Sequence, residues 1–160
     1  MIQIRRNVFE TNSSSTHSVT WASESLTDPK VLELDEEGFL RVFMEGYCSA
    51  CYYKDPRYKL GYLMQLCGYA NDIYLNACSE ELNEALELLY ACDDFKTIED
   101  TIIDYIGYHC KGIRFYEDSS YGYIDDGHEY NSVNEFLDEN CTDIINFVFG
   151  GAVLHYSYNG

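Results

Sequence analysis

Four residues of this 160-residue chain have the types and the spacing of a zinc site. Cys48 and Cys51 are separated by two residues, which lets both thiolates reach one tetrahedral ion, as in zinc knuckles and ribbons. His109 and Cys110 would complete a Cys₃His set, with Cys67 as the alternative fourth ligand. The spacing therefore predicts a structural zinc ion. The simpler alternative is a chance pair of thiols in a reduced, cysteine-rich protein.

A second group of chemically active side chains surrounds a polar run near the N-terminus. Of the eight side chains from Thr11 to Ser18, seven carry a hydroxyl or an amide and the eighth is His17. Such residues compete for backbone hydrogen bonds, so the simplest interpretation is a solvated loop bonded to itself. An enzyme or a phosphate binder would instead use arginine charge, a serine nucleophile and histidine proton transfer. The residues of this alternative site are Arg5, Arg6, Glu10, Ser13, Ser14 and His17.

The same stretch resembles a known group of sequences. The pattern Arg-Arg-x-Val-Phe-Glu-Thr-Asn-Ser-Ser-Ser-x-His-Ser at residues 5–18 resembles a little-characterised set of small phage and mobile-element proteins from Gram-positive bacteria. Residues 122–126 and 145–149 are similar, more faintly, to a Gly-Tyr-Ile-Asp and an Asn-Phe-Ile-Phe pattern of those proteins. The resemblance implies a phage or mobile-element setting, and no established activity comes with it.

A third group lies in one turn near residue 127. Asp125, Asp126, His128 and Glu129 offer hard ligands of the kind that hold a divalent cation, and Gly127 marks the turn. The resemblance above implies Asp-His-Gln after the isoleucine, and this chain has Asp-Asp-Gly-His there. Charged turn residues are usually solvated, so we expect these carboxylates to belong to a wider acidic surface.

Acidic residues dominate the chain, with 28 Asp and Glu against 10 Lys and Arg and a formal charge of −18. Residues 69–108 hold ten acids and one base, and from Phe115 to the C-terminus there are nine acids and no base. The helices predicted here have apolar inner faces, so their carboxylates should project outward among tyrosines. Spaced carboxylates imitate phosphates, and tyrosine offers rigid contact area. The residues predicted to bind a partner are Glu84, Glu87, Tyr90, Asp93, Asp94, Tyr105, Asp125, Asp126 and Glu129.

This charge balance predicts the kind of partner. It repels nucleic acid and anionic membranes and favours a basic protein. We therefore expect a non-enzymatic module that occupies the nucleic-acid groove of a host protein, such as a CRISPR effector nuclease. In that form it is a phage-encoded, anti-CRISPR-like DNA mimic. The alternatives are a small enzyme or nucleotide binder centred on the Ser/Thr/His loop, and a phage accessory protein whose acidity serves solubility alone.

The hydrophobic patterns predict how these residues are positioned. Residues 1–160 should form one α+β domain, with a mainly antiparallel sheet and helices packed on one face. Two hairpins are expected in residues 1–45, the first returning as strand 19–21 and the second spanning 31–43 around a Glu-Glu-Gly turn.

The remainder of the chain should be mostly helical. Three helices are expected in residues 57–110. The first covers about 57–69, the second begins after an N-cap at Ser79, and the third begins after an N-cap at Asp94 or Thr97 and ends before Lys111. In residues 111–160 the patterns predict strands 113–116 and 121–125, a helix over 132–147 begun by a Ser132–Glu135 capping box, and strand 152–158.

Composition also predicts the compartment. No run of about 18 apolar residues and no signal-peptide core occurs. Seven cysteines, an odd number, favour thiols or metal over a disulfide framework. We expect a soluble protein in the cytoplasm of the bacterial host.

Overall fold

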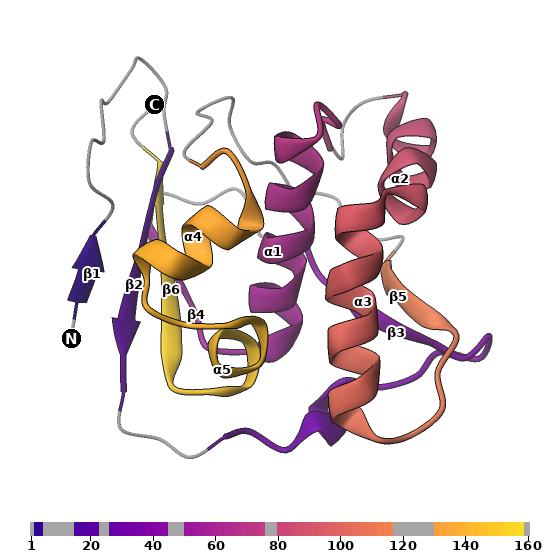
Figure 1. The fold of residues 1–160 in the computed structure, drawn as a ribbon, viewed down its shortest axis with the longest axis horizontal. Helices are drawn as coiled ribbons and strands as arrows, with labels where there is room; N and C mark the ends of the chain where they lie inside the picture. Colours follow the sequence, from indigo (N-terminus) through magenta and orange to yellow (C-terminus); the bar gives the residue numbers. More distant parts are fainter. Residues whose placement is uncertain are drawn as a thin grey trace.

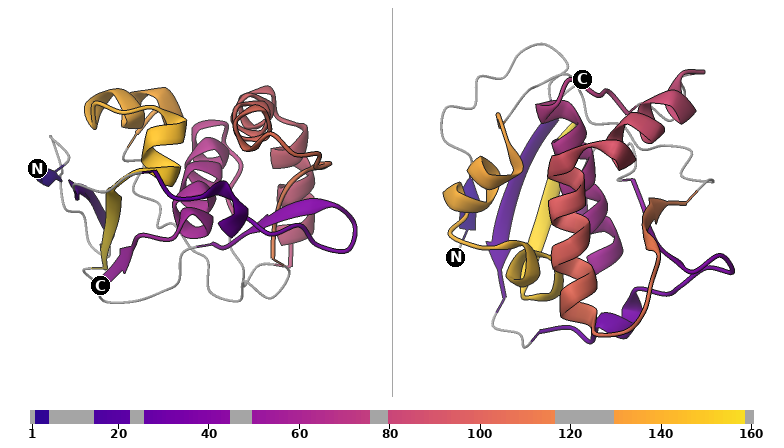
Figure 2. Two further views of the ribbon diagram at one scale, coloured as in Figure 1. Left: turned by 90° about the horizontal axis from the view of Figure 1, so that it is seen from below. Right: turned by 45° about the vertical axis from the view of Figure 1, so that its right-hand side comes forward.

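The computed structural model describes residues 2–4, 15–22, 26–44, 50–75, 80–116 and 130–158, and of residues 2–4, 15–17, 50–51 and 156–158 it describes the backbone alone. These parts form an α+β fold, as the patterns predicted. Helices pack on one face of a mainly antiparallel sheet, and a small second sheet lies at the far side of the helices (Figures 1 and 2).

The larger sheet has four strands in the order β1-β2-β6-β4, and every neighbouring pair is antiparallel. Val19 and Leu154 face each other across the central pair of strands and are fully buried, while their neighbours in sequence are half-buried. This alternation orients one face of the sheet toward the helices. The strands are β1 Ile2–Ile4, β2 Ser15–Trp21, β4 Ala50–Tyr53 and β6 Ala152–Tyr158.

Two of the predicted strands are confirmed in this sheet. The antiparallel pairing of β1 with β2 matches the first predicted hairpin, although β2 begins at Ser15 rather than Val19. The predicted final strand 152–158 is β6. The predicted strand 121–125 lies outside the described residues.

The helix α1, Pro56–Ala70, lies at the centre of the molecule (Figure 1). It begins with a side-chain cap, because Asp55 accepts a hydrogen bond from the backbone N–H of Arg57 and Pro56 fits the first helical position. The sequence predicted one apolar stripe, but every residue from Lys59 to Tyr69 is buried. At Gly61 an added Cβ would lie 1.8 Å from the carbonyl oxygen of Phe43, so only glycine allows this approach.

The helices α2, Leu82–Ala91, and α3, Asp93–Ile106, are separated by Cys92 alone. The predicted caps of α3 are wrong, because Asp94 and Thr97 lie inside the helix and Thr97 donates to the carbonyl of Asp93 instead. The helix also ends earlier than predicted, at Gly107, whose φ of +74° gives the left-handed turn that terminates many helices.

The predicted hairpin over 31–43 is also wrong. Its first arm is replaced by a short 3₁₀-helix, Pro29–Val31, and a single antiparallel bridge between Leu34 and Leu40. The second arm becomes β3, Phe39–Val42, which pairs in parallel with β5, Gly112–Phe115. The turn itself forms, since the carboxylate of Asp35 accepts hydrogen bonds from the backbone N–H groups of Glu37 and Phe39.

The last predicted helix is divided in two, α4 Val133–Glu139 and α5 Ile144–Phe149. The N-cap is confirmed, since Ser132 Oγ accepts from the N–H of Glu135 at 3.0 Å, while the Glu135 carboxylate accepts from Asn131 rather than from Ser132. The break follows from Cys141, whose φ of 53° stops α4.

Among the described residues, no helix combines the length and the apolar character needed to cross a membrane.

Candidate protein-binding surface

The outer faces of α2 and α3 carry a set of exposed carboxylates. Leu89 of α2 and Phe95, Ile98 and Ile102 of α3 are buried on the inner faces, so the acids between them point outward. In the described part of the chain none of these carboxylates forms a salt bridge. This acidic face consists of Glu84, Glu87, Asp93, Asp94, Asp100 and Asp104.

The arginines that could neutralise this face are bound to other acids. Arg57 donates to Asp55 at 2.8 Å, Arg114 donates to Glu99 at 3.1 Å, and Arg41 pairs with the carboxylate of Asp35. The backbone N–H of Phe39 and the Arg41 guanidinium hold the pKa of Asp35 below its ordinary value. All three arginines therefore have carboxylate partners outside the acidic face, and among the described residues no salt bridge compensates the negative charge of that face.

A cleft of about 710 Å³ lies between α2 and the β3–β5 sheet. The guanidinium of Arg114 lies 4.1 Å from the centre of the Tyr90 ring and 4.7 Å from that of Phe39. The hydroxyl of Tyr90 accepts a hydrogen bond from the backbone N–H of Phe115 at 3.0 Å, and burial raises its pKa. Tyr90 therefore forms a wall of this cleft rather than projecting from the helix, and Glu87 stands beside it.

The second predicted tyrosine, Tyr105, lies nearer the surface. It is half-buried, with its ring centre 5.1 Å from that of Phe149, and it lines a shallow hollow together with Asp100 and Asp104. These two acids were missing from the predicted set. Their spacing of four residues on α3, next to Tyr105, was the signal that would have found them.

The predicted zinc ligands are described only in part. Cys48 lies outside the described residues, and Cys51 is seen as backbone in β4, opposite Tyr156. His109 is exposed and Cys110 is buried, and both follow the end of α3 rather than lying in its last turn. In the described ranges no three His, Cys, Asp or Glu side chains gather to hold a metal ion. The zinc site stays a prediction.

The cysteine offered as the alternative fourth ligand is a buried free thiol. Burial raises the pKa of Cys67 to about 12, and the Nδ2 of Asn71 lies 4.0 Å from its sulfur. Burial also raises the pKa of Cys110. Burial therefore favours the protonated thiol at both positions in the metal-free protein.

The other two predicted groups lie almost wholly outside the described residues. The backbone of His17 belongs to β2, opposite Tyr156 of β6. The enzymatic alternative therefore stays a prediction. The remaining members, outside the described ranges, are Arg5, Arg6, Glu10, Ser13, Ser14, Asp125, Asp126, His128 and Glu129.

Comparison with protein-family models, curated proteins and solved structures finds no match for this chain.

Proposed function

We propose that this protein is a non-enzymatic, acidic protein-binding module that occupies the nucleic-acid groove of a basic host protein. The observation that carries the proposal is the acidic face, six exposed carboxylates on two consecutive helices with no cation paired to them among the described residues. In its most concrete form the module is a phage-encoded, anti-CRISPR-like inhibitor of a host nuclease, acting in the bacterial cytoplasm. The resemblance of residues 5–18 to small phage proteins supports that setting.

The rigidity of the acidic face favours this use. Phosphates in a nucleic acid have fixed spacing, and a protein that replaces them needs carboxylates on a scaffold that does not rearrange. The two helices are joined by one residue and packed through buried leucine, phenylalanine and isoleucine side chains. Lys and Arg of the partner would then meet a preformed array of negative charge, which speeds association.

Tyr105 gives the acidic face an aromatic contact. Exposed ion pairs contribute only about 0.2–1 kcal/mol each, so a charged surface alone binds weakly per contact. A half-buried tyrosine flanked by Asp100 and Asp104 supplies apolar area within the same surface. Aromatic residues in that position are common interface hot spots, so we expect Tyr105 to contribute more than any single acid.

The test compares two variants that change net charge by the same amount. Glu84→Gln, Glu87→Gln and Asp93→Asn together remove three charges from the acidic face, and Asp94 is kept because it accepts a hydrogen bond from Asn71. The matched control, Glu33→Gln, Glu36→Gln and Glu139→Gln, removes three exposed charges elsewhere. Each protein is immobilised, incubated with host lysate, and eluted with rising salt.

The proposal expects the unaltered protein to capture a basic nucleic-acid-binding protein that is released as salt rises from about 50 to 200 mM, and DNA to compete for it. The triple variant on the acidic face should lose capture about 3- to 150-fold, at about 0.2–1 kcal/mol per charge, while the control keeps it. If Ser14→Ala or His17→Ala abolishes activity and the acidic-face variant changes nothing, the proposal is wrong and the enzymatic alternative replaces it.

A further inference from the structure

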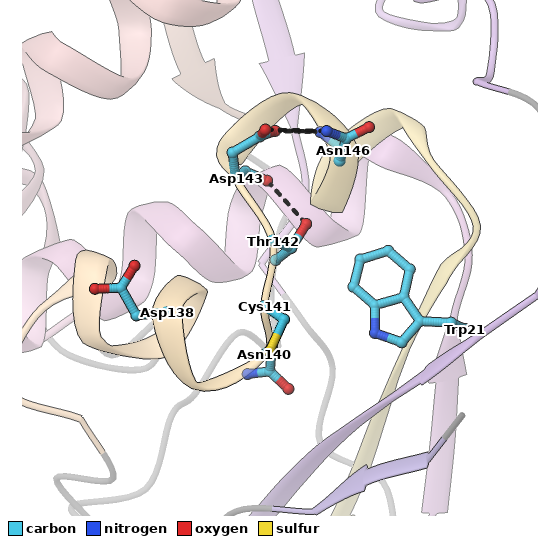
Figure 3. Close-up of a pocket in the computed structure, with 7 residues that line it drawn as sticks. All are labelled: Trp21, Asp138, Asn140, Cys141, Thr142, Asp143 and Asn146. Carbon is cyan, nitrogen blue, oxygen red and sulfur yellow. Dashed lines mark hydrogen bonds between the residues drawn. The ribbon is translucent and has the colours of Figure 1, made fainter.

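A separate pocket of about 670 Å³ opens where the end of β2 meets the bend between α4 and α5. Figure 3 shows the indole of Trp21 facing the segment Asn140–Asp143, and Asp138 on α4 also lines the pocket. None of the described residues that line it is a Lys or an Arg. Its polar groups are a carboxylate pair, amides, a hydroxyl and the thiol of Cys141.

The bend that forms this pocket is held by its own hydrogen bonds. The N–H of Thr142 donates to the carbonyl of Leu137 at 3.0 Å, and Asp143 caps α5 by accepting from the backbone and side-chain nitrogens of Asn146 at 2.8 and 2.9 Å. The bend and the Asp143 side chain are therefore held in place before any ligand arrives, which lowers the entropy lost on binding.

Two polar atoms of the lining residues form no hydrogen bond to the described residues. Asn140 is only 6% exposed, and its amide nitrogen donates to the carbonyl of Phe136 at 2.8 Å. Its amide oxygen accepts no hydrogen bond within the described ranges, and it is not sealed from solvent, so it opens on the pocket. The indole N–H of Trp21 likewise has no acceptor in the part of the chain that the structure describes.

We propose that this pocket binds the guanidinium group of an arginine side chain from a partner protein. A guanidinium is planar and cationic, so it can stack on the indole face while it donates hydrogen bonds to the Asn140 oxygen. The carboxylates of Asp138 and Asp143 add negative potential, and none of the described lining residues carries a positive charge that would favour an anion. That the arginine comes from a protein rests on the function proposed above, whereas binding of the guanidinium does not.

The chain offers a direct probe of this pocket. Trp21 is its single tryptophan, so fluorescence excited at the red edge of the indole band reports on this site alone. N-acetyl-arginine amide is titrated against N-acetyl-citrulline amide, which has nearly the same shape without the charge. We expect a saturable change in Trp21 emission with the arginine compound and at least about tenfold weaker binding of the citrulline compound. Equal binding of the two, or no saturable change, overturns the proposal.

Two variants separate this site from the acidic face. Asp138→Asn with Asp143→Asn removes the charge of the pocket and keeps the cap of α5, because asparagine caps helices as well as aspartate does. We expect it to weaken arginine-amide binding about tenfold, while Glu84→Gln with Glu87→Gln and Asp93→Asn leaves that binding unchanged. Unchanged binding in the pocket variant overturns the guanidinium assignment. Unchanged partner capture in the pocket variant overturns the assignment to a partner's arginine, whatever the acidic face does.

Discussion

Around β3 and β5 both arginines have carboxylate partners, whereas on the outer faces of α2 and α3 six exposed carboxylates have none in the described ranges. The two regions are neighbours, since Glu99 of α3 pairs with Arg114 of β5. Charge near the sheet is therefore paired within the fold, and the carboxylates of the acidic face have no cation partner among the described residues. Net charge alone would not have distinguished these two uses.

The largest expected effect comes from breaking a pair beside the sheet. Arg114→Met removes the contacts with Tyr90 and Phe39 and leaves Glu99 half-buried without its cation. We expect a loss of about 2 kcal/mol in the free energy of unfolding, and a melting temperature lower by roughly 4–8 °C. Urea denaturation and calorimetry measure both.

The matched control is Lys96→Met, which removes a positive charge from an exposed position of α3 that has no salt bridge in the described residues. It should change stability by no more than about 0.5 kcal/mol. Equal losses in the two variants would contradict the distinction between paired and solvent-facing charge.

A smaller effect is expected at low pH. The pKa of Asp35 is lowered in the folded state by the hydrogen bond from the backbone N–H of Phe39 and by Arg41. Its contribution to stability is therefore present above the unfolded value of about 3.9 and is lost as the pH falls below it. Thermal melts between pH 6 and pH 2.5 should show a shallower acid decline for Asp35→Asn than for the unaltered protein. Glu36→Gln, at an exposed neighbour, should keep the full decline.

The smallest effect on stability is expected on the acidic face, where the substitutions should stabilise the protein rather than destabilise it. Neutralising Asp100 and Asp104, which lie four residues apart toward the C-terminal end of α3, relieves repulsion between like charges, so stability should rise by about 0.3–0.5 kcal/mol at low salt. The gain should vanish near about 0.5 M NaCl, where repulsion is screened. A stability loss from these substitutions would mean that the carboxylates have structural partners, and the comparison between the two regions would fail.

Local signals were predictable and distant pairings were not. The Ser132 cap is specified by residues within one turn, and it was found from the sequence. The pairing of β3 with β5 joins residues 39–42 to residues 112–115 across three helices, while the Glu-Glu-Gly turn favoured a hairpin nearby. The helix break at Cys141 was also not predictable from the sequence, because a non-glycine residue rarely adopts a positive φ.

The candidate surface follows the same division, since its helical positions could be predicted from local sequence and its contacts with distant segments could not. Periodicity placed Glu84, Glu87 and Asp93 on the outer faces of the helices, and the structure has all three exposed there. The pocket at Trp21 joins the end of β2 to the α4–α5 bend, and only the folded chain brings these segments together. Tyr90 looked like a surface tyrosine because helix periodicity cannot show that β5 covers one side of it.

The burial of α1 on all sides has a consequence for how the sequence can change over time. From Lys59 to Tyr69 every replacement must fit space that is filled from each direction, and at Gly61 even a methyl group collides with the backbone of Phe43. The outer faces of α2 and α3 meet solvent and tolerate most side chains. Sequence drift should therefore concentrate on the surface proposed to meet the partner, so a lineage could acquire a new target while keeping the central helix that holds this surface in place.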